Sequence, residues 1–161
     1  MATDPESAAS PAGHPAAHAH PADFPPAVPQ LLHTVLDARD VRAEAEFWRM
    51  LLGLTYRPGD EAPDEGDVDD KDWLVLTHPD GRRALAVQEV EELTTSRWPE
   101  PGHPSVSHLD TTVPSRSALD AVHDLVLELG GELRFDRTDD PEEPLRAYAS
   151  PEGHIFCVFV A

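Results

Sequence analysis

The sequence predicts an α+β protein of two βαβββ modules, whose eight strands would form a curved mixed sheet around a cleft. Three observations support this fold class. Strand-like and helix-like segments follow one another in the same order twice. Each helix-like segment begins at a polar residue suited to an N-cap and ends at a glycine. A histidine precedes that glycine by a similar interval, since His33 precedes Gly53 by 20 residues and His108 precedes Gly130 by 22.

The first module is predicted to occupy about residues 30–92. Asp40 is suited to begin its helix, and Gly53 to end it. The apolar residues between them recur with helical spacing and define one buried face. Its members are Val41, Ala45, Trp48 and Leu52. The predicted strands are 30–38, 54–57, 72–78 and 83–90, the last two joined by a turn at Pro79-Asp80-Gly81.

The second module is predicted to occupy about residues 104–161. Its helix would begin after Ser115 or Ser117 and end at Gly130-Gly131. The expected buried face consists of Leu119, Val122, Val126 and Leu129. The predicted strands are 105–113, 132–136, 145–150 and 154–160, with the turn SPEG before the last of them.

Residues 1–29 form an Ala/Pro/His-rich tail that precedes the domain predicted for residues 30–161. Such a segment buries too little apolar surface to offset the entropy of ordering, so we expect it to be disordered. Its three histidines, His14, His18 and His20, could bind a metal weakly.

Composition and charge exclude several classes of partner. The net charge of −19 argues against a nucleic acid or an anionic membrane, because both require a basic surface. The single cysteine excludes an internal disulfide, and the start of the sequence has no signal-peptide pattern. No stretch is apolar enough to span a bilayer. We therefore expect a cytoplasmic protein.

Three segments in this order and spacing resemble the vicinal oxygen chelate superfamily, also called the glyoxalase/bleomycin-resistance/dioxygenase fold. They are HTVLDARD…FWRMLLGL (33–54), HPSVSHLDTTV (103–113) and ASPEGHIFCVFV (149–160). The phrases RWPEPGHPSVSHLD and EGHIFC resemble the actinobacterial glyoxalase-like subgroup in particular.

The resemblance implies up to four inward-facing metal ligands, on the first and last strands of each half. Carried over by position, the first-strand ligands are His33 and His108. The last strand of the first half offers Gln88, with Glu89 on the opposite face. The last strand of the second half offers Cys157, where metal-dependent relatives carry glutamate. The metal would be a divalent zinc, iron, manganese or nickel ion, or none would be bound.

Cys157 leaves two interpretations open. A thiolate and two imidazoles can bind zinc, whereas a cysteine flanked by apolar residues is commonly a small buried hydrophobe. Asp37 and Asp110 follow His33 and His108 along the chain. Either carboxylate could orient an imidazole by accepting its second N–H, or could be an ordinary polar residue near a strand end.

Three functions are compatible with the resemblance. The protein would bind a small molecule in the cleft between the modules without chemistry, as bleomycin-resistance relatives do. Alternatively it would be a metal-dependent lyase, isomerase or dioxygenase in which the metal acts as a Lewis acid. A third possibility is an assembly module with a vestigial cleft. The resemblance also implies a homodimer.

Overall fold

The computed structural model describes residues 29–104 and 107–161 of the chain. The chain divides between Leu31 and Leu32, and every helix and strand of the described residues belongs to the unit Leu32–Ala161. The disorder predicted for residues 1–29 lies almost wholly outside the described residues. Within the described part, no helix combines the length and the apolar character needed to cross a membrane.

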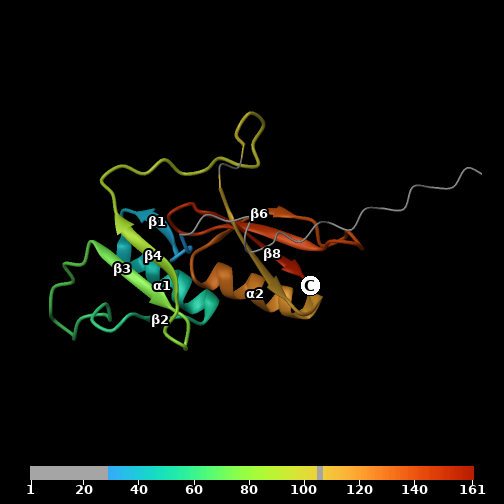
Figure 1. The fold of residues 1–161 in the computed structure, drawn as a ribbon. Coiled ribbons are helices and arrows are strands. Elements are labelled where there is room, and N and C mark those ends of the chain that lie inside the picture. Colours follow the sequence, from blue (N-terminus) through green and yellow to red (C-terminus); the bar gives the residue numbers. More distant parts are fainter. Residues whose placement is uncertain (1–28, 105–106) are drawn as a thin grey trace, which may run out of the picture. The chain divides into compact units, whose positions relative to one another are not determined.

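In the part of the chain that the structure describes, eight strands and two helices form in the predicted order, and both modules are α+β (Figure 1). The first module contains β1 (Thr34–Ala38), α1 (Val41–Leu52), β2 (Thr55–Tyr56), β3 (Trp73–Thr77) and β4 (Arg83–Glu89). The second contains β5 (Leu109–Val113), α2 (Arg116–Glu128), β6 (Glu132–Asp136), β7 (Leu145–Ala149) and β8 (Ile155–Val160).

The capping residues explain where both helices begin and where α1 ends. The Asp40 side chain accepts a hydrogen bond from the Ala43 N–H (2.9 Å) at the start of α1. Gly53 ends α1 at a φ of 63°, a left-handed conformation that favours glycine. Of the two serines considered for α2, Ser115 is the N-cap, because its side chain accepts from the Ala118 N–H (3.1 Å).

The two modules share one strand topology, which confirms the predicted repeat. The strand orders are β1-β4-β3-β2 and β5-β8-β7-β6, so the eight strands form two four-stranded sheets. In each sheet the first strand runs parallel to the last, and the remaining neighbours are antiparallel. Both sheets are therefore mixed, as predicted.

His33 and His108 lie just before their strands, which corrects the expectation that they lie within them. Pairing begins at Thr34↔Leu85 in the first module and at Leu109↔Phe156 in the second. By the same registers, His33 would lie opposite Ala84 and His108 opposite Ile155, one position before the paired residues. The two histidines nevertheless keep equivalent positions in the repeat.

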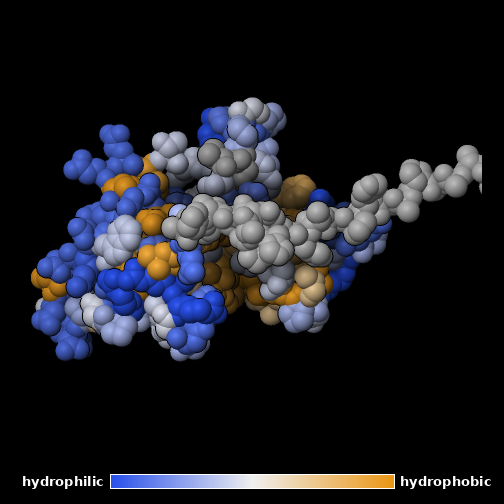
Figure 2. All heavy atoms as spheres, viewed as in Figure 1, coloured by the Kyte–Doolittle hydropathy of each residue, from blue (hydrophilic) through white to orange (hydrophobic). Residues whose placement is uncertain are grey.

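The core is continuous across the two modules. One buried cluster joins residues of α1 and its sheet to residues of α2, β7 and β8. The predicted helix faces are largely confirmed, since Val41, Ala45 and Trp48 of α1 are buried. In α2, Leu119 and Val126 are buried. Figure 2 shows hydrophilic side chains over the acidic segment before β3 and hydrophobic residues gathered where α2 lies.

A buried carboxylate, Glu44, connects α1 to the turn before β8. Glu44 is fully buried although no apolar pattern marked it for the core. Its Oε1 accepts from Trp48 Nε1 (2.7 Å), and its Oε2 accepts from the Glu152 N–H (3.2 Å). Burial raises the pKa of Glu44, and hydrogen bonds from Ser150 and Trp48 together with the nearby His154 offset only part of that rise.

Replacing Glu44 with glutamine should make stability less sensitive to pH. The amide keeps the size of the side chain but cannot accept both hydrogen bonds, so at pH 5 we expect a loss of about 1–3 kcal/mol. Because the folded pKa of Glu44 is raised, its contribution to stability is fully present below the ordinary pKa of 4.5 and is lost as pH rises through the folded value. The difference in the free energy of unfolding between the unmodified protein and E44Q should therefore become smaller between pH 5 and pH 8.

Urea denaturation followed by tryptophan fluorescence measures this difference at each pH. Glu46 provides a matched control on the same helix, because its pKa is lowered, mainly by the hydrogen bond from Arg49. For E46Q the pH dependence should be reversed: its loss in the free energy of unfolding should become smaller as pH falls. A deficit of E44Q that grows with pH would contradict the raised pKa.

Candidate functional site

The candidate site lies on the sheet faces opposite the helices. Leu36 and Ala38 of β1 pack in the core, so the alternation of the strand places Val35 and Asp37 on the other face. In β8, Phe156 and Val158 pack in the core, which places Cys157 on that face too. These faces carry most of the residues that the sequence pointed to.

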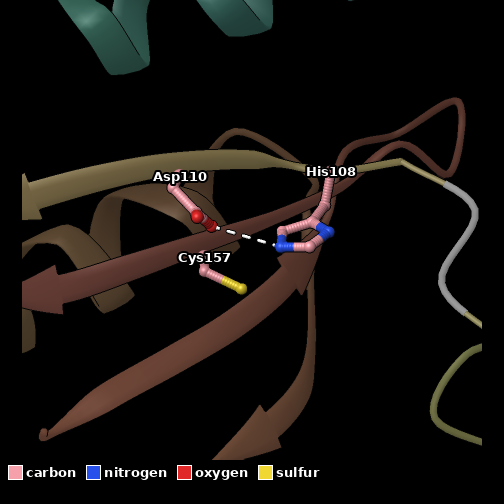
Figure 3. Close-up of side chains that lie close together, drawn as sticks. All are labelled: His108, Asp110 and Cys157. Atoms are coloured by element: carbon pink, nitrogen blue, oxygen red, sulfur yellow. Dashed lines mark ion pairs between the residues drawn. The ribbon is translucent and has the colours of Figure 1, made fainter. Parts of the chain in front are cut away.

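Three potential metal ligands converge at the start of the second sheet (Figure 3). His108 immediately precedes β5, Asp110 is in β5, and Cys157 comes from β8. Their ligand atoms all lie within 4.8 Å of one another, and His108 Nε2 lies 3.4 Å from Asp110 Oδ1. Within residues 29–104 and 107–161, this is the group of three or more His, Cys, Asp or Glu side chains that could hold a metal ion.

The register of the sheet explains this convergence. Asp110 pairs directly with Cys157 in the parallel ladder, so their side chains share one face. His108 lies two residues before Asp110 and reaches the same face. Asp110 thus contacts the His108 imidazole, as considered from the sequence, and it also offers a carboxylate as a possible ligand, which sequence reasoning did not anticipate. The sequence signal was its spacing of two residues from His108.

The thiol of Cys157 is strongly biased toward its protonated form. Burial raises the pKa of Cys157 to about 11, and the charge of Asp110 and a hydrogen bond with it act in the same direction. Cys157 is buried, whereas the side chains of His108 and Asp110 are 42% and 58% exposed. A cation at this position would reverse the electrostatic preference, because it favours both the carboxylate and the thiolate.

His33 lies outside this cluster, on the first sheet. Its ring centroid is 6.3 Å from that of Trp73, and its Nδ1 is buried without a hydrogen-bond partner. Burial lowers the pKa of His33, and the positive charges of Arg83 and Arg57 lower it further. The imidazole is therefore favoured in its neutral form, the form in which histidine binds metals.

Gln88 is also separate from the cluster. Its Nε2 donates to Asp37 Oδ1 (2.6 Å) across the parallel pair β1 and β4. The registers show that Ala86, which pairs with Val35, occupies the position equivalent to Cys157. The structure thus brings His108 and Cys157 together, and it places His33 and Gln88 on the other module.

A cavity of about 440 Å³ lies between the two modules and reaches His108. Its walls are the start of β1, the residues around the start of β5 and the first residues of β8. They comprise Thr34, Val35, Leu36, Asp37, Ser107, His108, Leu109, His154 and Ile155. We call this cavity the cleft.

His154 fixes one wall of the cleft. Its Nε2 donates to the Asp37 carbonyl oxygen (2.7 Å), so a residue of the second module holds the first strand of the first module. Sequence reasoning missed this residue, because the turn SPEGH indicates a strand start but says nothing about a contact with β1.

Comparisons with known proteins agree with this architecture. A family model for a glyoxalase-like domain matches residues 33–159. No curated protein matches the chain. The actinobacterial subgroup stays a prediction.

Several solved structures are similar to the chain. A mutant of the fosfomycin resistance protein FosX from Listeria monocytogenes, in complex with Mn(II) and 1S,2S-dihydroxypropylphosphonic acid, has a TM-score of 0.60 and 13% identity, covering 84% of this chain and 94% of that one. A possible glyoxalase from Bacillus cereus has a TM-score of 0.55 and 19% identity, covering 80% and 96%. A glyoxalase/bleomycin resistance protein/dioxygenase family enzyme from Burkholderia phytofirmans has a TM-score of 0.58 and 12% identity, covering 80% and 96%. At these identities the similarity shows the fold.

The environment of Cys157 predicts slow alkylation at neutral pH. A thiol with a pKa of about 11 carries very little thiolate at pH 7, and the thiolate is the reactive form. Replacing Asp110 with asparagine removes the negative charge that disfavours the thiolate, so D110N should react faster with iodoacetamide. The rate constant, measured by mass spectrometry between pH 7 and pH 10, checks this expectation.

Asp124, on α2, supplies the control for a general change in charge. D124N should react at the rate of the unmodified protein. Equal rates for D110N and D124N would contradict an electrostatic role of Asp110.

Proposed function

This chain belongs to the glyoxalase-like domain family of the vicinal oxygen chelate superfamily, and on that premise we propose that it binds a small molecule in the cleft. The observation that carries the proposal is the cavity of about 440 Å³ bounded by β1, β5 and β8. Its volume falls in the range of about 300–1,000 Å³ typical of small-molecule sites.

The walls of the cleft combine apolar and polar groups. Val35, Leu109 and Ile155 supply apolar surface that a ligand can bury. Asp37, Ser107 and His108 supply hydrogen-bonding groups that can fix its orientation. Val35 is 41% exposed, which leaves its side chain available for contact with a ligand.

A second candidate function is metal-dependent chemistry at the cleft, and the convergence of His108, Asp110 and Cys157 favours it. A nitrogen, an oxygen and a sulfur donor suit zinc, whereas manganese prefers oxygen-rich sites. Ligand atoms of a tetrahedral zinc site lie roughly 3.3–3.8 Å apart, given metal–ligand distances of about 2.0–2.3 Å. His108 Nε2 and Asp110 Oδ1 have this spacing, at 3.4 Å, and all three ligand atoms lie within 4.8 Å of one another. This donor set therefore fits a zinc ion.

A bound metal would supply Lewis-acid stabilisation of a developing oxyanion. His108 would hold the ion and also form part of the cleft wall, which places a ligand's oxygen atoms within its reach. Asp110 would balance the charge of the ion. The Mn(II) in the FosX complex supports metal binding at the same fold.

Ligand binding in the cleft can be tested by screening metabolites for thermal stabilisation. A ligand present at 100 times its Kd stabilises the folded state by about 2.7 kcal/mol, which raises the Tm by several degrees. Replacing Val35 with tryptophan fills the cleft, so V35W should lose this stabilisation. Val68, which is 85% exposed on the segment before β3, provides the control V68W. Equal stabilisation of V35W and V68W would contradict binding in the cleft.

Metal binding at this site is tested in a variant in which the tail histidines His14, His18 and His20 are replaced by alanine, so that they cannot bind metal themselves. We expect one zinc ion per chain by elemental analysis, and an affinity reduced at least about 100-fold in H108A and C157A, because each loses a direct ligand. Cobalt substitution should give a thiolate-to-metal absorption band that C157A lacks. H123A, which changes a histidine on α2, is the control. Equal zinc content in H108A and H123A would rule out this site.

A further inference from the structure

Described residues of the loop between β4 and β5, within 93–97 and 103–107, line a second cavity of about 430 Å³ against the turn before β8. Glycine at position 153 allows this close approach. A Cβ atom there would lie 2.9 Å from both Cβ and Cγ2 of Thr95, and the φ of Gly153 is 91°. The loop is therefore seated on the turn where a larger residue would push it away.

The lining of this cavity includes several groups that can donate hydrogen bonds. Thr94, Thr95 and Ser96 contribute hydroxyl groups, and the next residue, Arg97, contributes a guanidinium. The imidazole of His103 joins them from the other end of the loop. A guanidinium donates only, and hydroxyl and imidazole groups can donate, so the cavity offers many donors to a ligand.

The negative charge nearest to the cavity is already compensated. Among the described lining residues, Glu152 is the only carboxylate. Glu152 accepts hydrogen bonds from Arg39 Nε (3.1 Å) and from the Asp40 N–H (3.2 Å), both in the first module. Arg97 pairs with Glu100 through one terminal nitrogen, which leaves further N–H groups on its guanidinium. The described lining therefore contains one arginine, Arg97, and one carboxylate, Glu152, whose charge Arg39 balances.

We propose that this second cavity binds the acidic group, a carboxylate or a phosphate, of a ligand that occupies the cleft. The inference rests on the proposed function of the cleft, because the two cavities share Ser107, His154 and Ile155. A molecule lying in the cleft can extend past these residues into the second cavity. Arg97 then donates charge-assisted hydrogen bonds to its oxyanion, and the hydroxyl groups complete the shell. The ligand class is therefore a small organic acid or phosphate ester.

Titration of the full-length protein with inorganic phosphate and with acetate, followed by NMR, tests the proposal. We expect the amide signals of the loop to shift with at least one of these anions and not with glycerol at the same concentrations. R97Q should weaken the anion's affinity roughly 10-fold, as expected for the loss of a charge-assisted hydrogen bond. H103Q should weaken it as well.

Arg82 provides the matched control, because it is exposed in the turn between β3 and β4 and lies outside both cavities. R82Q removes the same charge and should leave anion affinity unchanged. Equal affinities of R97Q and R82Q, or no response to either anion, would overturn the inference. The two proposals can fail separately. If only ligand binding in the cleft is wrong, no metabolite would stabilise the unmodified protein, but anions would still shift the loop signals, in V35W as well.

Discussion

The ring of Phe156 on β8 packs against three aromatic rings, two of which belong to the other module. Its centroid lies 5.1 Å from that of Trp48 and 5.9 Å from that of Phe47, both on α1, and 5.4 Å from that of Tyr148 on β7. Such aromatic pairs contribute about 0.5–1.5 kcal/mol each beyond the burial of their area. Neither module contains this cluster by itself, so each stabilises the other and the geometry of the cleft depends on the contact.

The same junction holds the residues at the start of β8 in place. The buried carboxylate of Glu44 accepts the Glu152 N–H, and His154 donates to the Asp37 carbonyl. Glu152 also binds Arg39 and the backbone of Asp40. The turn before β8 is thus joined to β1 and α1 at several points. Both cavities are built on this turn, so its position determines their shapes.

The second sheet places a thiol beside a carboxylate, because Cys157 on β8 pairs directly with Asp110 on β5 in the parallel ladder. In the protein without metal, that carboxylate and burial keep the thiol protonated. Once the thiol loses its proton, the Cys157 thiolate and the Asp110 carboxylate would both attract a cation. Binding of a metal and titration of Cys157 are therefore coupled.

Local sequence patterns were sufficient to predict the fold class and the order of all ten elements, because apolar spacing, N-cap residues and glycine turns act over a few neighbouring residues. They also identified His33 and His108 as equivalent positions in the repeat. The convergence of Asp110 with His108 and Cys157, the bond from Gln88 to Asp37 and the burial of Glu44 emerged only from the folded chain. Those outcomes depend on strand register and on packing between modules, which bring together side chains as many as 113 positions apart in the chain. Local patterns carry no information about such pairings, since the same alternation of apolar and polar residues is compatible with several registers.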